Sequence, residues 1–430
     1  MNEITEVHKA WFVGWDWAKN KHQLSVVDAS GREVEQWEAA HTAEGLRDAV
    51  ERLKRYEAEG GVAVSIETPH GLFVEALLEA GITVYALHAT AAKRLREALA
   101  GESKNDVRDA WSLAESLRLH HRRWTPLKRD DEVTRRLQVL TREEQLLVDE
   151  INRLGNRLQA TLGQYYPQAL ELFEQWGHVS AWDFVLQWST PQAFQKASWR
   201  SLEKFLHVHR LAKPERLEAW KRIHQKAGDW PMSRVLSDGK HRQVELAARQ
   251  LRLVQEGLRD YRQQIEALWK EHPDQPIFKS FKGMGARIAP RILSELGTDR
   301  GNFPDANSIA CYGGVAPRQY QSGKIAMVRC RHAANHTLQH NLYLWARASV
   351  LWVPWARAFY LHEKKRGLWS ADVYRRLAAK WTRIFWRCWV ERQPYDETRW
   401  MQSLKDRGSW LYAETLKLME QPLEPMEAPL

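Results

Sequence analysis

Four carboxylates occupy positions where an acidic side chain needs a partner or a function. Asp16 lies inside the apolar run WFVGWDW, where an isolated charge is costly unless it is paired or binds a cation. Glu67 ends the apolar run VAVSIE beside a turn that contains proline, and functional side chains are common at such strand ends. Asp106 and Asp109 begin a predicted helix in SKNDVRDA, and their i, i+3 spacing places both on one face, with Cβ atoms about 5–6 Å apart.

Carboxylate oxygens of this kind suit Mg²⁺ or Mn²⁺. Two such ions activate the attacking oxygen and stabilise the leaving oxygen in phosphoryl transfer. Each acid also has a simpler explanation: Asp106 and Asp109 favour a helix N-terminus, and Glu67 can cap the following turn. Asp16 has the poorest structural explanation, so the spacing leaves both a shared metal site and separate structural roles open.

A second group of residues suits contact with phosphate. The segment FKSFKGMGARIAPRILSELG, residues 278–297, has the pattern of a helix-hairpin-helix, in which Gly283 and Gly285 permit a tight turn. Exposed amides at the start of its second helix can hold a DNA phosphate without reading the base sequence. Three cations accompany this turn: Lys279, Lys282 and Arg287. An ordinary helical hairpin is the alternative.

The segment CYGGVAPRQYQSGKIAMVRCRH contains Ser322, which we expect to lie in a loop because glycine and proline are frequent around it. A serine hydroxyl can attack a phosphodiester where cations or a metal stabilise the developing charge. Basic side chains surround this serine: Arg318, Lys324, Arg329, Arg331 and His332. Ser-Gly is also a common turn, and Tyr320 is a rival nucleophile.

Alternating strands and helices would position the carboxylates. Strands are predicted over residues 11–17, 23–28, 33–38, 62–67 and 83–87, and helices over 41–56, 73–79, 91–100 and 105–119. Three strands in a row followed by alternating helix and strand predict an α/β domain of about 125 residues.

The middle of the chain has a heptad period. Apolar residues spaced by three and four run from Val133 to Leu158, with one polar break at Glu144, and again from Val244 to Leu268. The two seams bracket a tryptophan-rich insert at about 170–240. They predict either one antiparallel coiled-coil hairpin or pairing with the same seams of another subunit. The many tryptophans are interpreted mainly as packing residues, with base stacking as the alternative.

Composition favours a polyanionic partner. The formal charge is +10 and the pI is about 9.4, as expected of a chain that neutralises phosphates. The scattered cysteines Cys311, Cys330 and Cys388 give no zinc spacing and suit a reducing cytoplasm. No signal peptide and no apolar stretch near the roughly 20 residues of a membrane span are present, so no membrane association is expected.

The order of these motifs resembles the DEDD transposases of bridge-RNA-guided insertion sequences. GWDWAK, SIETPHG, SKNDVRDA, FKGMGARIAPRILSELG and GGVAPRQYQSG carry the resemblance, which covers about residues 10–125 and 275–390. It implies a RuvC-like, RNase-H-type domain with Asp16, Glu67, Asp106 and Asp109 as the metal-binding tetrad. It further implies Ser322 as the nucleophile, in an active site assembled from two subunits.

The resemblance also implies partners. They are target and donor DNA, a structured guide RNA that supplies sequence choice, and further copies of the chain in a dimer or tetramer, at work on the nucleoid in a prokaryotic cytoplasm. Ten residues are expected to contact nucleic acid: Lys104, Lys279, Lys282, Gly283, Gly285, Arg287, Arg318, Lys324, Arg329 and Arg331. We expect domains over 1–125, 126–272 and 273–420, the last mainly helical, and a loose tail over 421–430.

Two other functions compete with serine-based recombination. A RuvC-like structure-specific nuclease or junction resolvase would cut DNA without any covalent protein–DNA species. A nucleic-acid-binding protein that had lost the chemistry would not need all four carboxylates, so their presence argues against it.

Overall fold

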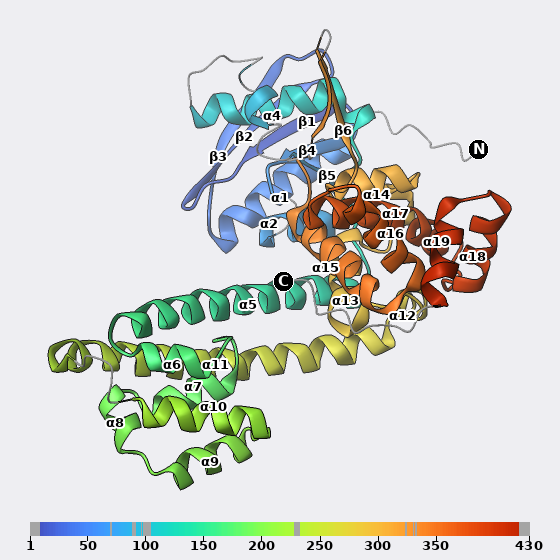
Figure 1. Cartoon of the computed structure of the whole chain (residues 1–430). Coiled ribbons are helices and arrows are strands. Elements are labelled where there is room, and N and C mark those ends of the chain that lie inside the picture. Colours follow the sequence, from blue (N-terminus) through green and yellow to red (C-terminus); the bar gives the residue numbers. More distant parts are fainter. Residues whose placement is uncertain are drawn as a thin grey trace. The chain divides into compact units, whose positions relative to one another are not determined.

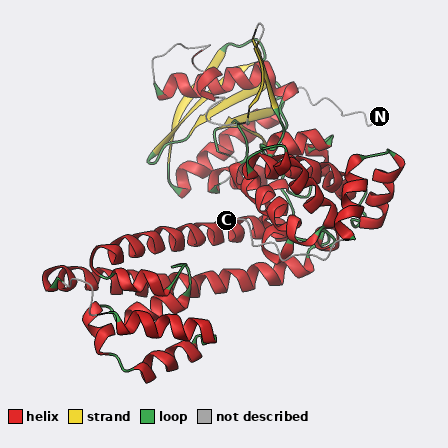
Figure 2. Ribbon diagram, in the orientation of Figure 1, coloured by secondary structure: helices red, strands yellow, loops and turns green. Residues whose placement is uncertain are grey.

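The chain folds into two compact units in the computed structural model, which describes residues 9–68, 71–87, 92–95, 97, 105–227, 233–322, 325–329, 331 and 333–420 (Figure 1). The first unit comprises Met1–Asp131, Thr298–Ser308 and Arg318–Ala334. The second comprises Glu132–Gly297, Ile309–Pro317 and Asn335–Leu430. Strands lie in the first unit, whereas the second consists of helices and their connections within the described residues (Figure 2).

A five-stranded mixed sheet forms the centre of the first unit. Its strands are β1 (Trp11–Asp16), β2 (Lys21–Asp28), β3 (Glu33–Ala40), β4 (Val62–Ile66) and β5 (Thr83–Ala86), in the order β3-β2-β1-β4-β5. The first three strands are antiparallel neighbours, and β4 and β5 continue the sheet parallel to β1. The predicted run of three strands followed by alternating helix and strand is therefore confirmed.

Helices cover both faces of this sheet. Apolar side chains on one face, including Val13 and Trp15, pack against α1 (Ala43–Ala58) and α2 (Leu72–Glu79). The opposite face, with Phe12 and the small residue Ala63, packs against α4 (Asp106–His120), which a short 3-10 turn, η1 (His121–Arg123), follows. Side chains of a strand alternate between the faces, so each strand supplies both layers of the core.

A second, two-stranded sheet corrects one prediction. The expected loop around Ser322 is a β-hairpin of β6 (Arg318–Ser322) and β7 (Ile325–Arg329), in which Ser322 pairs with Ile325. The physical reason is the composition of the two arms. Gln319-Tyr320-Gln321 alternates and Ile325-Ala326-Met327-Val328 has high β propensity, so the glycine and proline that suggested a loop only flank or join strands.

Two long helices organise the second unit, α5 (Glu132–Tyr165) and α11 (Arg234–Glu271). Three contacts give their relative direction. Thr134 contacts His272, which directly follows α11, Glu144 binds Arg262, and Leu147 packs near Gly257. Residues later in α5 thus meet residues earlier in α11. The helices are therefore antiparallel, and the two predicted apolar seams meet within one chain. Coiled-coil geometry itself remains a prediction.

The insert between these helices is a small helical cap. It consists of α6 (Pro167–Leu172), α7 (Val179–Gln187), α8 (Pro191–Lys196), α9 (Trp199–Val208) and α10 (Pro214–Gln225). Trp176, Trp182, Trp188 and Trp220 are buried in its core, so packing accounts for these tryptophans.

The rest of the chain is mainly helical, as expected. It contains α12 (Gln275–Lys279), α13 (Gly285–Leu296), the short η2 (Arg300–Asn302), α14 (Ala306–Tyr312), α15 (His336–Trp352), α16 (Pro354–Lys365), α17 (Ser370–Val390), α18 (Glu397–Asp406) and α19 (Trp410–Met419). Trp381, Phe385 and Trp389 form a buried face of α17. None of the helices in the described part of the chain is long and apolar enough to cross a membrane.

Candidate active site

Two of the four predicted carboxylates lie side by side at the carboxyl end of the sheet. In the parallel pair β1–β4, Trp15 is level with Ile66, so Asp16 and Glu67 are the next positions on neighbouring strands. Trp15 and Ile66 belong to the core on the α1–α2 face. Alternation therefore directs Asp16, and by extension Glu67, toward the face that α4 covers. Asp16 is half-buried and Glu67 is exposed.

The other two carboxylates stand in the first turn of α4. This helix begins at Asp106 because the Asn105 side chain caps it, accepting a hydrogen bond from the Val107 amide at 3.1 Å. Asp106 is exposed and Asp109 is half-buried. Two acids in the first turn are also favoured by the positive end of the helix dipole, which lowers the cost of gathering negative charge here.

Close packing fixes where this turn lies on the sheet. A Cβ added to Gly14 would come within 1.8 Å of the Ala110 carbonyl oxygen and 2.8 Å of the Leu113 Cβ. Gly14 precedes Asp16 by two residues and points to the same face, and Ala110 follows Asp109 directly. The backbone of α4 thus rests on β1 beside Asp16, which only glycine permits.

Lys21 gives an independent indication of this placement. It stands at the start of β2, and its pKa is raised first by a hydrogen bond to Glu38 and further by the negative charge of Asp106. Lys21 begins β2 just after the short turn that follows Asp16, so Asp106 lies near the end of the sheet that carries Asp16.

The fold thus brings Asp16, Glu67, Asp106 and Asp109 to one face at one end of the sheet, from three separate stretches of sequence. Among the residues that the structure describes, no three His, Cys, Asp or Glu side chains gather closely enough to hold a metal ion together. The arrangement is a convergence of backbone positions.

A histidine pair, which the sequence analysis missed, lies on the opposite face: His22 is buried and His41 is exposed. His22 is fully buried on β2, and its Nε2 lies 3.0 Å from Nδ1 of His41. Phe73 of α2 packs against both rings. Burial, and then the charge of His41, lowers the pKa of His22 to about 4. The alternation of β2, which places His22 among apolar neighbours, was the available signal.

The nucleophile candidate Ser322 ends β6, two positions beyond Tyr320. The backbones of Arg318 and Arg329 are opposite each other in the register of the two strands, at the base of the hairpin. Arg331 follows the hairpin and is half-buried. This hairpin belongs to the same compact unit as the five-stranded sheet. Lys324 and His332 lie outside the described residues, as does Lys104.

The predicted glycine turn is present in the second unit. Gly283, between α12 and α13, has φ of 85°, and Gly285, the first residue of α13, has φ of 58°. A Cβ on Gly283 would lie 2.8 Å from the Ser349 amide nitrogen of α15, whereas Gly285 has open space around it. The start of α13 is therefore accessible, beside the exposed side chains of Lys279 and Arg287. Lys282 instead pairs with Glu397 at 3.1 Å.

Comparison with known proteins agrees with this architecture. Residues 13–167 match the DEDD transposase family, and residues 275–361 match the transposase family IS116/IS110/IS902. The putative mini-circle transposase for IS117 of Streptomyces coelicolor is 30% identical over 400 residues, covering 90% of this chain and 96% of that relative.

Two further relatives come from insertion elements. The IS110 protein of Streptomyces coelicolor is 28% identical, covering 85% of this chain and 91% of its own. The IS116 protein of Streptomyces clavuligerus is 25% identical, covering 88% and 94%.

The fold and the comparisons define a DEDD transposase, a class of DNA-recombining enzyme, and the mixed sheet with its helices is consistent with a RuvC-like domain. The chain belongs to the IS110/IS116 family of transposases.

Proposed function

We propose that this transposase cuts and rejoins DNA through the hydroxyl of Ser322, with Asp16, Glu67, Asp106 and Asp109 as the metal-binding tetrad. The observation that carries the proposal is the convergence of the four carboxylate positions on one face of the sheet. The grouping of the Ser322 hairpin with that sheet in one compact unit supports it.

The donor set fits a hard divalent cation. All four side chains offer carboxylate oxygens, and the N-terminus of α4 offsets part of their mutual repulsion. Mg²⁺ or Mn²⁺ bound there would stabilise the negative charge that develops on a phosphate during transfer. Asp16 and Asp109, both half-buried, are the residues that would hold the cation most firmly, because their surroundings restrict them.

The serine supplies the covalent step. The Ser322 oxygen attacks the phosphorus and loses its proton, a serine–phosphate ester bond forms, and one P–O bond of the DNA backbone breaks to release a free hydroxyl end. A hydroxyl from another strand reverses the reaction on that ester, so the ends are rejoined without an external energy source. Basic residues of the serine segment, among them Lys324 two positions after Ser322, would supply positive charge for the phosphate.

The partners follow from the reaction. Exchange between target and donor DNA requires two sites, so the proposal includes a dimer or tetramer, with the α5–α11 helix pair as a contact. A structured RNA would supply sequence choice by base pairing. Lys279, Arg287 and the open amides near Gly285 would hold backbone phosphate. The domain division at about residues 125 and 272 remains part of this proposal.

Carboxylate substitutions test the tetrad. Asp109→Asn and Asp16→Asn should each lower Mg²⁺-dependent cleavage of labelled element-end DNA by about a hundredfold or more, since a metal-stabilised charge contributes several kcal/mol to the transition state. DNA binding, measured in parallel, should change little. Asp48→Asn is a matched control, because Asp48 is exposed on α1, on the other side of the sheet. Cleavage at the wild-type rate by Asp109→Asn would remove the metal assignment.

A further inference from the structure

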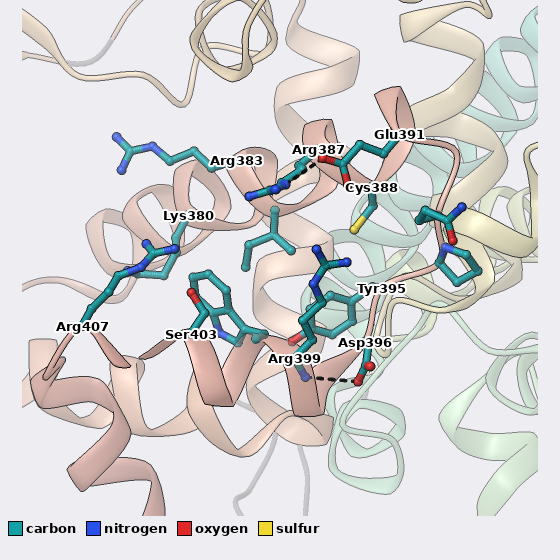
Figure 3. A pocket seen from close by; sticks show the side chains of 14 residues that line it. Lys380, Arg383, Arg387, Cys388, Glu391, Tyr395, Asp396, Arg399, Ser403 and Arg407 are labelled. Carbon is teal, nitrogen blue, oxygen red and sulfur yellow. Dashed lines mark hydrogen bonds and ion pairs between the residues drawn. The ribbon is translucent and has the colours of Figure 1, made fainter. Parts of the chain in front are cut away.

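A strongly cationic pocket lies in the second unit, between α17 and α18. Its volume is about 560 Å³, within the roughly 300–1,000 Å³ typical of pockets for small organic groups. Five basic side chains line it, against two acidic ones, Glu391 and Asp396. The basic residues are Lys380, Arg383, Arg387, Arg399 and Arg407 (Figure 3). We refer to it as the α17–α18 pocket.

Both acids of the pocket are already engaged. Glu391 accepts from the Arg387 guanidinium at 2.9 Å, and Asp396 caps α18 by accepting from the backbone amides of Thr398 and Arg399. Of the other four cations, Arg383, Arg399, Arg407 and Lys380, none forms an ion pair with any carboxylate that the structure describes. Positive charge therefore outnumbers negative charge in the pocket, and four of its five cations have no ion-pair partner among the described residues.

Lys380 shows that these charges act on one another. Its pKa is lowered first by burial and then by the positive charges of Arg383 and Arg407, which approach it from α17 and from the end of α18. Its ammonium lies 5.5 Å from the centre of the Phe359 ring. Repulsion of this kind is relieved by an anion bound among the three groups.

One wall of the pocket is largely apolar. Ile384, Cys388, Pro394, Tyr395 and Trp400 contribute to it. Tyr395 stacks on Phe281 at 5.0 Å and accepts a hydrogen bond from the Trp355 indole at 3.0 Å, so its ring is fixed. A cationic rim over a fixed aromatic and apolar wall matches a group that carries both a phosphate and a flat ring.

We propose that the α17–α18 pocket binds one unpaired nucleotide of a nucleic-acid strand, with the base against Tyr395 and Trp400 and the phosphate among Lys380, Arg383 and Arg407. The choice of nucleic acid as the source of the phosphate rests on the proposed function, in which DNA and RNA are the partners. A paired base stays in its stack and cannot enter a pocket, so the ligand is a single-stranded or flipped-out nucleotide. DNA and RNA offer the same chemistry.

The first test compares variants of the full-length chain by fluorescence anisotropy with labelled oligo-dT and oligo-U of about ten nucleotides. Arg383→Gln with Arg407→Gln should weaken binding about tenfold and lower the slope of log K against log salt by about 0.7 for each phosphate that the variant no longer neutralises. Lys365→Gln with Lys405→Gln is the matched control, since both lysines are exposed and lie outside the pocket. The control should bind within about twofold of wild type.

Two filling variants separate the pocket from a merely basic surface. Cys388→Phe and Ser403→Phe add a ring from α17 and from α18 without changing charge, and each should weaken single-strand binding about tenfold. Circular dichroism shows whether each variant folds. If one of the two does not fold, the binding measured for the other variant tests the proposal. Neither filling variant should change the binding of a duplex of the same length.

A local readout uses the Cys388 thiol, whose pKa burial raises to about 11. In a Cys311→Ser, Cys330→Ser background, oligonucleotide should slow maleimide modification of Cys388 severalfold, and Arg383→Gln with Arg407→Gln should abolish that protection. Greater protection by oligo-U or by oligo-dT identifies RNA or DNA as the source, and either supports the proposal.

Two results would overturn the proposal. One is wild-type binding by both filling variants with no protection of Cys388; the other is equal loss of duplex and single-strand binding on charge removal. Ser322→Ala leaves the pocket intact, so failure of the DNA-joining chemistry would not affect these measurements.

Discussion

Asp16 and His22 show how neighbouring residues divide the two faces of the sheet. Asp16 pairs in register with Gln23, and both face α4, whereas Trp15 and His22 face α1 and α2. The depressed pKa of His22 keeps that ring uncharged at neutral pH. His22 lies on the opposite face of the sheet from Asp16. Because its ring is uncharged at neutral pH, it adds no positive charge that would disfavour a cation bound by the carboxylates.

This burial predicts an acid-sensitive fold. The pKa of His22 falls from its ordinary 6.5 to about 4 on folding, so the unfolded chain binds the proton more readily. The stability that the folded protein gains from a neutral His22 is therefore complete above pH 6.5, and it is lost as the pH falls from 6.5 toward 4. His22→Phe, which cannot titrate, should flatten the fall of the thermal midpoint between pH 6.5 and 5, by the equivalent of about 1–2 kcal/mol.

The control for this experiment is His340→Gln, because His340 is exposed. It should keep the wild-type dependence on pH. An unchanged slope in His22→Phe would mean that protonation of His22 is not linked to unfolding.

At the scale of elements, the contact of α4 with β1 decides whether the carboxylates converge. Gly14→Ala places a methyl group within 1.8 Å of a backbone oxygen, so α4 must move. We predict a loss of about 1–3 kcal/mol in stability and a drop in cleavage larger than stability explains, since Asp106 and Asp109 move with the helix. Cleavage is measured well below the unfolding temperature.

Gly239→Ala is the matched substitution, since a methyl group there meets nothing within 4 Å. As a helix-interior position it should be neutral or slightly stabilising. Full cleavage activity in Gly14→Ala would show that α4 can shift without disturbing the site.

The polar break in the first heptad seam also has a structural reason. Glu144 is buried and binds Arg262 of α11 at 2.8 Å and Arg291 of α13 at 2.5 Å, so it joins three helices. Glu144→Leu leaves two guanidinium groups without their counter-charge and should cost about 3–5 kcal/mol, seen as a lower thermal midpoint. The adjacent, exposed Glu143→Leu should change stability by less than about 0.5 kcal/mol.

Periodicity explains which elements the sequence could predict. The strands around Asp16 and Glu67 are short apolar runs and the two long seams have a heptad pattern, and these strands and both long helices appear in the structure. The Ser322 hairpin was missed because short strands beside glycine look like loops. The α17–α18 pocket was missed because Arg383 and Arg407 lie on different elements, and only tertiary packing brings them to one place.

At the scale of the whole molecule, the proposed strand exchange would use several copies of the chain. Apolar side chains remain exposed along the long helices of the second unit, at Val139 and Leu146 of α5 and at Leu246 and Leu253 of α11. We predict that Leu146→Lys with Leu253→Lys lowers the mass measured by light scattering, because buried lysine is costly at an interface. An unchanged mass would place subunit contacts elsewhere, and unchanged circular dichroism is the control for folding.

The covalent step is the centre of the account, and a denaturing gel tests it most directly. Wild type, Ser322→Ala and Tyr320→Phe are each incubated with labelled DNA, the co-expressed RNA and Mg²⁺. We predict a protein-linked DNA band in wild type and Tyr320→Phe that disappears in Ser322→Ala. Cut DNA without a linked band, equal in all three proteins, would contradict the account and indicate a hydrolytic nuclease.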